Sequence, residues 1–285
     1  MMLRHLTGTK ESTSRRSNIF ELYHLRIKQS FIHFFALTIF LTKTPNSVVG
    51  FSSSRGGLQM SAGISPEYAS AAARRQPEST SFVTNKMCPY AQKAWIALEY
   101  SDIPYTMKEI SLYGANGKPD WFLELNPGGT VPVLECYGGA VVLPDSEVIL
   151  DFLSEEGRIE SPNLNKLVLK KNNEETKALV KKWRNIMTKQ VNPLGKKAVL
   201  GGGSSGKKDL FKLLQQIDKD VKGPYLCGKD VTVADCAAFP FLWRINEEFG
   251  LSEDEGCERL SEWLRTCEQI DAFKKTIQTS WWWWW

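Results

Sequence analysis

Apolar positions follow two different spacings along this chain, and the change between them divides the sequence after residue 80. From residue 81 to about 157, short apolar runs of strand length alternate with longer segments of helical spacing. The predicted order is β-α-β-α-β-β-α, which is too mixed for an all-β fold and suits a small sheet covered by helices. The predicted strands are 81–84, 105–110, 131–135 and 140–143, and the predicted helices are 89–100, 118–125 and 146–155.

From residue 174 onward the spacing is helical throughout, so no further strand is needed. Thr232 and Asp235 fit a capping box in which Asp replaces the usual Glu. Pro240 lies inside the apolar segment that follows and predicts either a kink or a shifted start of that helix. The predicted helical segments are 174–192, 207–222, 232–249 and 257–277, each bounded by Gly, Pro or Ser.

The first 80 residues have the composition of a targeting segment. An apolar run of eleven residues at 31–41 is too short for a membrane-spanning helix, which needs ~20 residues, and it matches the apolar core of a signal peptide. Val48 and Gly50 suit a cut before Phe51, and the stretch that follows is rich in Ser, Ala and Arg. The whole leader resembles the signal-plus-transit presequence of algae with secondary plastids, which implies a plastid location. The alternatives are a secretory signal, a membrane anchor or a cytoplasmic protein.

Charge and the two ends of the chain limit the expected partners. The leader holds ten Lys or Arg against four acidic residues, so the formal net charge of +4 says nothing of nucleic-acid binding by the nearly neutral remainder. Five tryptophans at 281–285 could lie at a membrane interface or fold over an acceptor pocket, but we interpret them as a gene-model artefact. The expected parts are a largely disordered leader at 1–80, an α/β domain at 81–157, a linker at 158–173, an all-helical domain at 174–280 and the tryptophan tail.

Cys88 stands where the first predicted strand turns into the first predicted helix. Pro89 suits the first helical position, so the sulfur would face unpaired N–H groups at the positive end of the helix dipole. This setting favours the thiolate and predicts a depressed pKa. Ala91 stands where a dithiol motif would have its second cysteine, so an external thiol must resolve any mixed disulfide. The alternative for the motif alone is a buried cysteine that packs as a small hydrophobe.

Three further sequence features that could bind a ligand follow Cys88 in the chain. Pro132 interrupts a Val-rich strand, and such a proline, often cis, would leave the backbone of Val131 free to pair with an extended peptide. Asp145 and Ser146 open a helix, where carboxylate, hydroxyl and N–H groups can cap the helix or hold a zwitterion. Lys118 offers a nearby cation, although a lone surface lysine is usually only solvated.

These pieces together resemble the soluble glutathione transferase superfamily over roughly residues 81–275. The motifs are Cys-Pro-Tyr-Ala-Gln from 88, Lys-Pro-Asp-Trp-Phe from 118, Asn-Pro-Gly-Gly-Thr-Val-Pro-Val-Leu-Glu from 126, Asp-Ser-Glu-Val-Ile from 145 and Gly-Pro-Tyr-Leu-Cys-Gly-Lys-Asp-Val-Thr-Val-Ala-Asp from 223. The resemblance implies an α/β thioredoxin-like domain followed by an all-α domain. A cysteine in place of Ser or Tyr resembles the omega, lambda and dehydroascorbate reductase branches, and the Asp-Ser pair is most like plant-type dehydroascorbate reductases.

The resemblance implies a role for each of the residues singled out. Cys88 would be the nucleophile that forms a mixed disulfide with glutathione. Tyr90 would line the pocket beside the sulfur, although simple packing explains it as well. Met87 departs from the plant-type reductases, which have an acidic residue before the cysteine, and this puts the ascorbate-side contact in doubt. The implied glutathione contacts are the Val131 backbone beside a cis Pro132, Asp145 and Ser146 at the γ-glutamyl end, and Lys118 at the glycyl carboxylate.

The reaction expected from this set is thiol–disulfide exchange, with glutathione as co-substrate and a small oxidised or electrophilic compound as the second substrate. No metal, nucleotide or nucleic acid is implied, and membrane contact is expected only through the leader or the tryptophan tail. The protein would be a monomer or a homodimer. The alternatives are a transferase that conjugates glutathione to electrophiles and a non-catalytic relative of the chloride-intracellular-channel type.

Two other features suggest chemistry but are given structural interpretations. The other five cysteines lack metal-ligand spacing and are expected to be core or neutral surface thiols, with Cys236 in the core. The run 201–208 nearly spells a phosphate-binding loop, but Lys208 stands where Ser or Thr must contact Mg²⁺. We expect a flexible loop between helices there.

Overall fold

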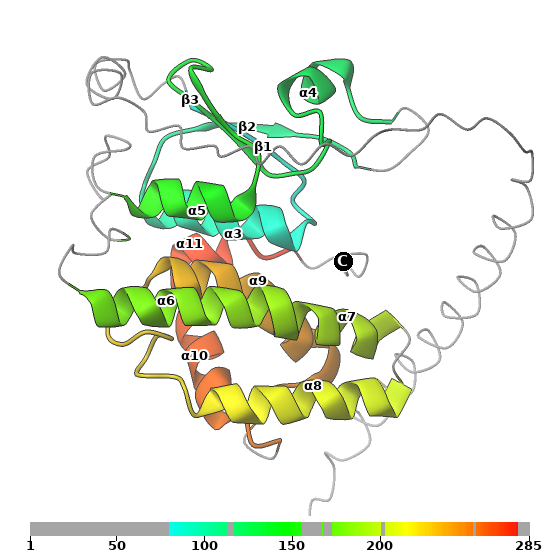
Figure 1. Ribbon diagram of the computed structural model, residues 1–285, viewed down its shortest axis with the longest axis vertical. Helices are drawn as coiled ribbons and strands as arrows, with labels where there is room; N and C mark the ends of the chain where they lie inside the picture. Colours follow the sequence, from blue (N-terminus) through cyan, green and yellow to red (C-terminus); the bar gives the residue numbers. More distant parts are fainter. Residues whose placement is uncertain are drawn as a thin grey trace, which may run out of the picture. The chain divides into compact units, whose positions relative to one another are not determined.

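The computed structural model describes residues 80–112, 117–155, 167, 173–200, 203–252 and 255–278 (Figure 1). The expected leader, its cleavage site, most of the linker and the tryptophan tail lie outside these residues. The strands are β1 Ser81–Thr84, β2 Thr106–Glu109, β3 Val133–Cys136 and β4 Val141–Leu143. The helices are α3 Pro89–Tyr100, α4 Asp120–Leu125, α5 Ser146–Ser154, α6 Glu174–Ile186, η3 Met187–Val191 (a π-helix), α7 Asn192–Leu200, α8 Gly203–Asp218, α9 Val233–Phe249, α10 Glu258–Glu268 and α11 Asp271–Lys274.

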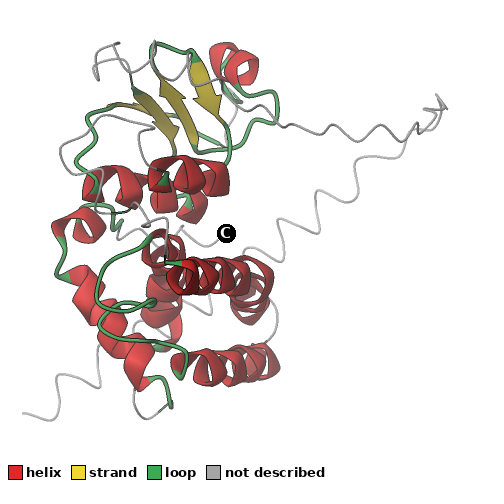
Figure 2. Ribbon diagram, turned by 60° about the vertical axis from the view of Figure 1, so that its left-hand side comes forward, coloured by secondary structure: helices red, strands yellow, loops and turns green. Residues whose placement is uncertain are grey.

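The four strands form one mixed sheet in the order β2-β1-β3-β4. Strand β1 pairs in parallel with β2 and antiparallel with β3, and β3 pairs antiparallel with β4. Helices α3 and α5 lie on one face of the sheet, between it and the helical region, while α4 lies away from them (Figures 1 and 2). This is the expected thioredoxin-like arrangement. Pairing in β3 begins at Val133, two residues later than predicted, because Pro132 has no N–H to donate to a ladder.

Helix α3 lies at the centre of the structure, with apolar neighbours on several sides. Its residues Ile96 and Leu98 are fully buried, and they belong to the same core as Phe82 and Leu134 of the sheet. The same core continues into α9, where Phe239 is also fully buried. Burial of this kind supplies most of the stability of a helix within a protein. The site described below depends on α3, because Cys88 precedes its first residue.

One prediction for the helical region is wrong, and one of the two alternatives for Pro240 is not found. Residues 203–208 belong to the first turns of α8, although we expected a loop there. Tertiary packing explains this helix start, because a Cβ on Gly206 would lie only 3.0 Å from the Cα atom of Ala198 in α7. Glycine therefore allows the two helix backbones to approach closely. Helix α9 begins at Val233 and includes Pro240, so the shifted start that we considered is not found.

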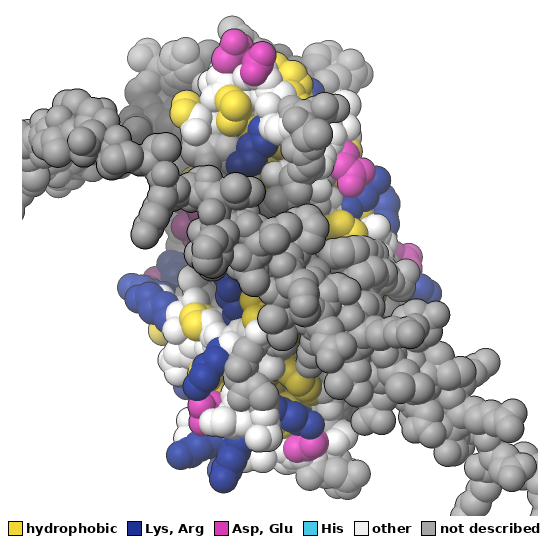
Figure 3. Space-filling model, turned by 90° about the vertical axis from the view of Figure 1, so that its right-hand side faces the viewer, with side chains coloured by type: hydrophobic (Ala, Val, Ile, Leu, Met, Phe, Trp, Pro, Cys, Tyr) yellow, Lys and Arg dark blue, Asp and Glu magenta, His cyan; other side chains and the backbone are white. Residues whose placement is uncertain are grey.

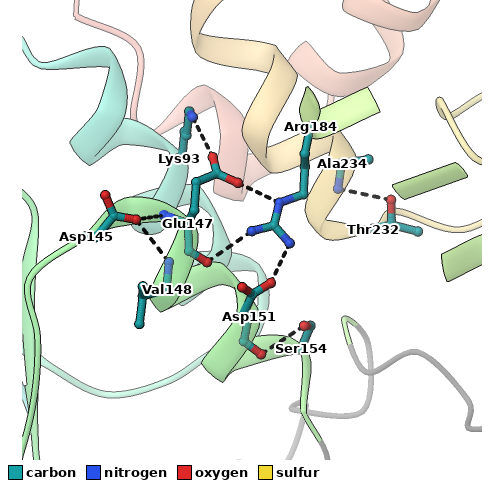
Figure 4. A network of polar contacts seen from close by, with 9 residues as sticks. All are labelled: Lys93, Asp145, Glu147, Val148, Asp151, Ser154, Arg184, Thr232 and Ala234. Atoms are coloured by element: carbon teal, nitrogen blue, oxygen red, sulfur yellow. Dashed lines mark hydrogen bonds and ion pairs between the residues drawn. The ribbon is translucent and has the colours of Figure 1, made fainter. Parts of the chain in front are cut away.

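The capping box at the start of α9 is confirmed and is deeply buried. Thr232 accepts a hydrogen bond from the Ala234 N–H at 3.2 Å (Figure 4), and Asp235 accepts one from the Thr232 N–H at 2.8 Å. The Asp235 carboxylate also accepts from the Leu226 N–H and from the Trp263 indole N–H, both at 2.9 Å. A fully buried carboxylate thus fixes the loop before α9 and a side chain of α10 at the same time.

Charged side chains of both signs share the surface of the helical region. Figure 3 shows Lys and Arg interspersed with acidic residues on one face. Lys197 of α7 pairs with Asp209 of α8 at 2.9 Å, and Lys207 pairs with Glu255 at 3.6 Å. This mixture agrees with the near-neutral charge of the chain after the leader. Among the described residues, no helix combines the length and the apolar character that crossing a bilayer would require.

We predict that Asp235→Ala lowers the free energy of unfolding by about 3 kcal/mol, because it leaves several buried donors without an acceptor. Urea unfolding followed by circular dichroism measures this change. The matched control is Asp230→Ala, which removes an exposed carboxylate from the same loop and is expected to have little effect. Equal effects of the two substitutions would contradict the structural role of the buried capping box.

Candidate active site

Cys88 is the N-cap residue of α3, with extended backbone angles and Pro89 at the first helical position. The turn that carries it is held by Asn85, whose carbonyl accepts from the Cys88 N–H at 2.9 Å and whose side-chain oxygen accepts from the Met87 N–H at 3.0 Å. The Asn85 amide in turn donates to the Ile110 carbonyl at 2.9 Å. The predicted strand-to-helix position of this cysteine is therefore confirmed, and the turn has a fixed shape.

The ionisation of Cys88 differs from the sequence prediction. Burial raises the pKa of the thiol above its ordinary value. The backbone N–H groups of Ala91 and Tyr90 lower this pKa, as do the positive charges of Arg244 and Lys93, but burial outweighs them together. The predicted depression of the pKa is therefore wrong. The sulfur packs against a small apolar cluster that includes Val131, and the sequence did not show how deeply this cluster covers it.

The segment before β3 contributes the second wall of the site. The Val131–Pro132 peptide bond is cis, as the sequence suggested, and Val131 is buried in the cluster that Cys88 contacts. The preceding turn is closed by a bond from the Gly129 N–H to the Asn126 carbonyl at 2.8 Å. The Lys118 amine lies directly over this turn, since a Cβ on Gly129 would be 3.0 Å from its Nζ atom. The structure therefore brings Lys118 beside the loop that leads to Val131.

Asp145 and Ser146 occupy the N-terminus of α5. One oxygen of Asp145 accepts from the N–H groups of Glu147 at 2.7 Å and Val148 at 3.1 Å, and its second oxygen points away from the helix (Figure 4). Ser146 is almost fully buried beside it. The helix-cap interpretation of Asp145 is therefore correct, and its second oxygen takes no part in the cap.

A partly buried ion-pair network connects this helix to α3 and to α6. Glu147 binds the Lys93 amine at 2.7 Å and the Arg184 guanidinium at 2.7 Å, and Arg184 also binds Asp151 at 2.5 Å (Figure 4). Lys93 is only 1 % exposed, so its charge depends on Glu147 for a partner in the interior. The network places the N-terminus of α5 beside α3, and thereby Asp145 near the helix that Cys88 begins.

Tyr90 is partly exposed and is held by the helical region. The Asn192 side-chain amide donates to its hydroxyl at 2.5 Å, and its ring packs edge-on against Phe241 with centroids 5.5 Å apart. Asn192 directly follows the π-helical segment η3, a type of irregularity that often occurs at functional sites. Tyr90 therefore packs against the helical region and also remains 38 % exposed.

Arg244 of α9 is the residue near Cys88 that the sequence analysis missed most clearly. It is buried, and it donates to the Gln92 side-chain oxygen at 2.6 Å and to the Met87 carbonyl at 3.3 Å. Lys93 and Glu147 were missed as well. The signal available in the sequence was a charged residue inside an otherwise apolar helical segment, for both Lys93 and Arg244. Such a residue must find a polar partner in another element.

We predict that Glu147→Gln lowers the free energy of unfolding at pH 7 by about 2–3 kcal/mol, because it leaves Lys93 buried without its counter-charge. Lys93 and Arg184 hold the folded-state pKa of Glu147 below its ordinary 4.5. The stabilisation is therefore present above about pH 4.5 and is lost as the pH falls through the lower folded value. Unfolding curves for both proteins between pH 3 and 7 should converge in acid. Glu174→Gln, in an exposed ion pair, serves as the control; a difference independent of pH would refute this account.

Comparison with known proteins identifies the family. Residues 87–156 match the glutathione S-transferase N-terminal domain, and residues 192–266 match the glutathione S-transferase C-terminal domain. The chain is 28 % identical over 160 residues to the probable cytosolic glutathione S-transferase DHAR1 of Oryza sativa subsp. japonica, a match that covers 55 % of this chain and 67 % of the relative. It is also 28 % identical over 196 residues to the probable chloroplastic glutathione S-transferase DHAR2 of the same plant, covering 67 % of this chain and 65 % of that relative.

A further relative and a solved structure agree with this match. Glutathione S-transferase 1 of Dianthus caryophyllus is 32 % identical over 178 residues, which cover 57 % of this chain and 76 % of the relative. The crystal structure of glutathione transferase Omega 3C from Trametes versicolor superposes with a TM-score of 0.61 at 24 % identity, over 75 % of this chain and 95 % of that one. The arrangement of a thioredoxin-like sheet and a helical region, together with these matches, shows that the chain belongs to the glutathione S-transferase family.

Proposed function

We propose that this protein is a glutathione-dependent thiol transferase of the dehydroascorbate reductase type, acting through Cys88 as a single reactive cysteine. The observation that carries the proposal is the placement of Cys88 at the N-cap of α3, where two backbone N–H groups favour its thiolate. A relative whose name includes DHAR1 supports the choice of branch. Ala91 stands where a resolving cysteine would be needed for a dithiol mechanism, so the second thiol must come from glutathione.

The same proposal assigns the glutathione contacts. The backbone of Val131 would pair with the cysteinyl part of glutathione, since the ladder of β3 begins only at Val133. The outward oxygen of Asp145 and the hydroxyl of Ser146 would hold the charged γ-glutamyl end at the N-terminus of α5. The amine of Lys118, positioned over the turn before Val131, would hold the glycyl carboxylate.

With a glutathionylated thiol as substrate, the exchange has two balanced steps. The Cys88 thiolate attacks the glutathione sulfur of the substrate disulfide, so that a Cys88–glutathione disulfide forms and the substrate leaves as a thiolate. A second glutathione thiolate attacks that disulfide, which releases glutathione disulfide and restores the Cys88 thiolate. With dehydroascorbate, Cys88 adds to a carbonyl carbon. A glutathione thiolate then attacks the Cys88 sulfur of this adduct, so that the carbon–sulfur bond breaks, ascorbate leaves with two more electrons and a Cys88–glutathione disulfide forms. A second glutathione resolves this disulfide as in the first case.

Conjugation of glutathione to an electrophile is the second candidate. The raised pKa of Cys88 favours it, because a thiol that stays protonated at neutral pH is a weaker nucleophile than the thiol-transfer mechanism requires. In a conjugating enzyme the glutathione sulfur itself is the nucleophile, and Cys88 would be dispensable or obstructive. The two candidates therefore differ in how they respond to loss of Cys88.

We also propose plastid delivery by residues 1–80. The signal-like apolar run followed by a Ser- and Arg-rich stretch supports it, as does the name of the chloroplastic rice relative. We expect a fluorescent protein fused behind residues 1–80 to enter plastids of an alga with secondary plastids, as seen by microscopy. A fusion that remains in the cytosol would refute any targeting role, and one retained in the secretory pathway would refute the transit part.

We predict that Cys88→Ser abolishes glutathione-dependent reduction of both dehydroascorbate and hydroxyethyl disulfide, at least ~100-fold, because the nucleophile is lost. Rates are measured on the full chain beside chlorodinitrobenzene conjugation. The matched control is Cys227→Ser, which removes the other partly exposed cysteine among the described residues and should leave reduction intact. If reduction is absent in the unsubstituted protein while conjugation survives Cys88→Ser, the conjugating function replaces the proposed one.

A further inference from the structure

We propose that Arg244 is a positioning residue for Cys88, which holds the cysteine-bearing turn from the helical region and keeps a buried positive charge beside the sulfur. The expected effect of Arg244 on turnover rests on the proposed function, whereas its expected effect on the ionisation of Cys88 does not. Arg244 joins two parts of the chain that are 157 residues apart, because its guanidinium reaches the carbonyl of Met87, the residue before the cysteine.

The contacts of Arg244 show how it holds the turn. One guanidinium nitrogen donates to the Gln92 side-chain oxygen at 2.6 Å and to the Pro240 carbonyl at 2.7 Å, and the other donates to the Met87 carbonyl at 3.3 Å. The Gln92 amide donates to the carbonyl of Thr276 at 3.2 Å and to its hydroxyl at 3.1 Å. The first turn of α3 is therefore connected through Arg244 to α9 and through Gln92 to the segment after α11.

The charge of Arg244 acts on the same sulfur. Burial lowers the pKa of its guanidinium to about 10, and a thiolate at Cys88 would oppose this change. Arg244 therefore remains charged at neutral pH, and it lowers the pKa of the Cys88 thiol in return. The other groups that act on this sulfur are Lys93, which is paired with Glu147, and the backbone N–H groups of Tyr90 and Ala91.

The position of Arg244 is hard to explain by stability alone. The side chain is 1 % exposed, and removing a guanidinium from water carries a large desolvation penalty. Apolar residues of similar volume often replace buried charges with no loss of stability. Burial of the Cys88 sulfur favours the thiol, and the charge of Arg244 favours the thiolate. This effect on Cys88 gives a reason for a buried guanidinium at this position.

The test measures the ionisation of Cys88 directly in the full chain, without glutathione. Iodoacetamide alkylation of the peptide that contains Cys88 is followed by mass spectrometry as a function of pH. We expect the unsubstituted protein to have a midpoint above the ~8.5 of an ordinary thiol. Arg244→Gln should raise it by about one further unit, which is a tenfold smaller thiolate fraction at neutral pH. Arg244→Lys keeps the charge and should stay near the original midpoint.

Two further variants separate charge from packing. Gln92→Met removes the hydrogen bond to Arg244 but leaves the guanidinium, so it should lower thermal stability without moving the midpoint. Arg244→Met fills the volume without a charge and repeats the test if Arg244→Gln does not fold, as judged by circular dichroism. An unchanged midpoint in either folded neutral variant would overturn the proposal, and so would an equal shift in Gln92→Met. The alkylation midpoint is measured without turnover, so it tests the role of Arg244 even if the proposed reaction is not found.

Discussion

The structure depends on a helix that is buried between two layers. Helix α3 packs against the sheet on one side and against α9 on the other (Figure 1), and even its polar residues Gln92 and Lys93 are almost completely removed from water. A buried amide and a buried amine are tolerated only when their hydrogen-bonding groups have partners. Those partners come from other elements, namely Glu147 of α5 and Arg244 of α9. The polar contacts around α3 therefore specify how the layers fit together.

This constraint also determines the character of the site. The sheet and its helices supply the cysteine, the cis-proline loop and the helix terminus to which we assign glutathione in our proposal. The helical region supplies charge and support from behind, through Arg184 and Arg244. Burial raises the pKa of the Cys88 thiol, and the surrounding N–H donors and cations lower it by a smaller amount. The pKa of the Cys88 thiol thus depends on groups from both regions and does not follow from its turn alone.

Much of the fold could be predicted from the sequence, because local signals and periodicity agree there. The limits of the strand Ser81–Thr84 and the helix Pro89–Tyr100 are as predicted, and the capping box of Thr232 and Asp235 is present. The start of α8 could not be predicted, since the run 201–208 resembled a phosphate-binding loop and the close approach of Gly206 to Ala198 cannot be read from the sequence. The pKa of Cys88 and the role of Arg244 depend on packing between segments that are distant in the sequence. The spacing of apolar residues within one segment does not predict such packing.

The bond between Gln92 and Thr276 has a consequence for the order of events during synthesis. Its two residues are 184 positions apart, so the ribosome has made nearly the whole described chain before the second one exists. The sheet and its helices are complete in sequence much earlier, and domains made first generally fold first. During that interval α3 lacks both Arg244 and Thr276, and its inner face is open to water. A nascent chain made up to that point therefore lacks these supporting contacts at its cysteine site, and they form only after Arg244 and Thr276 have been synthesised.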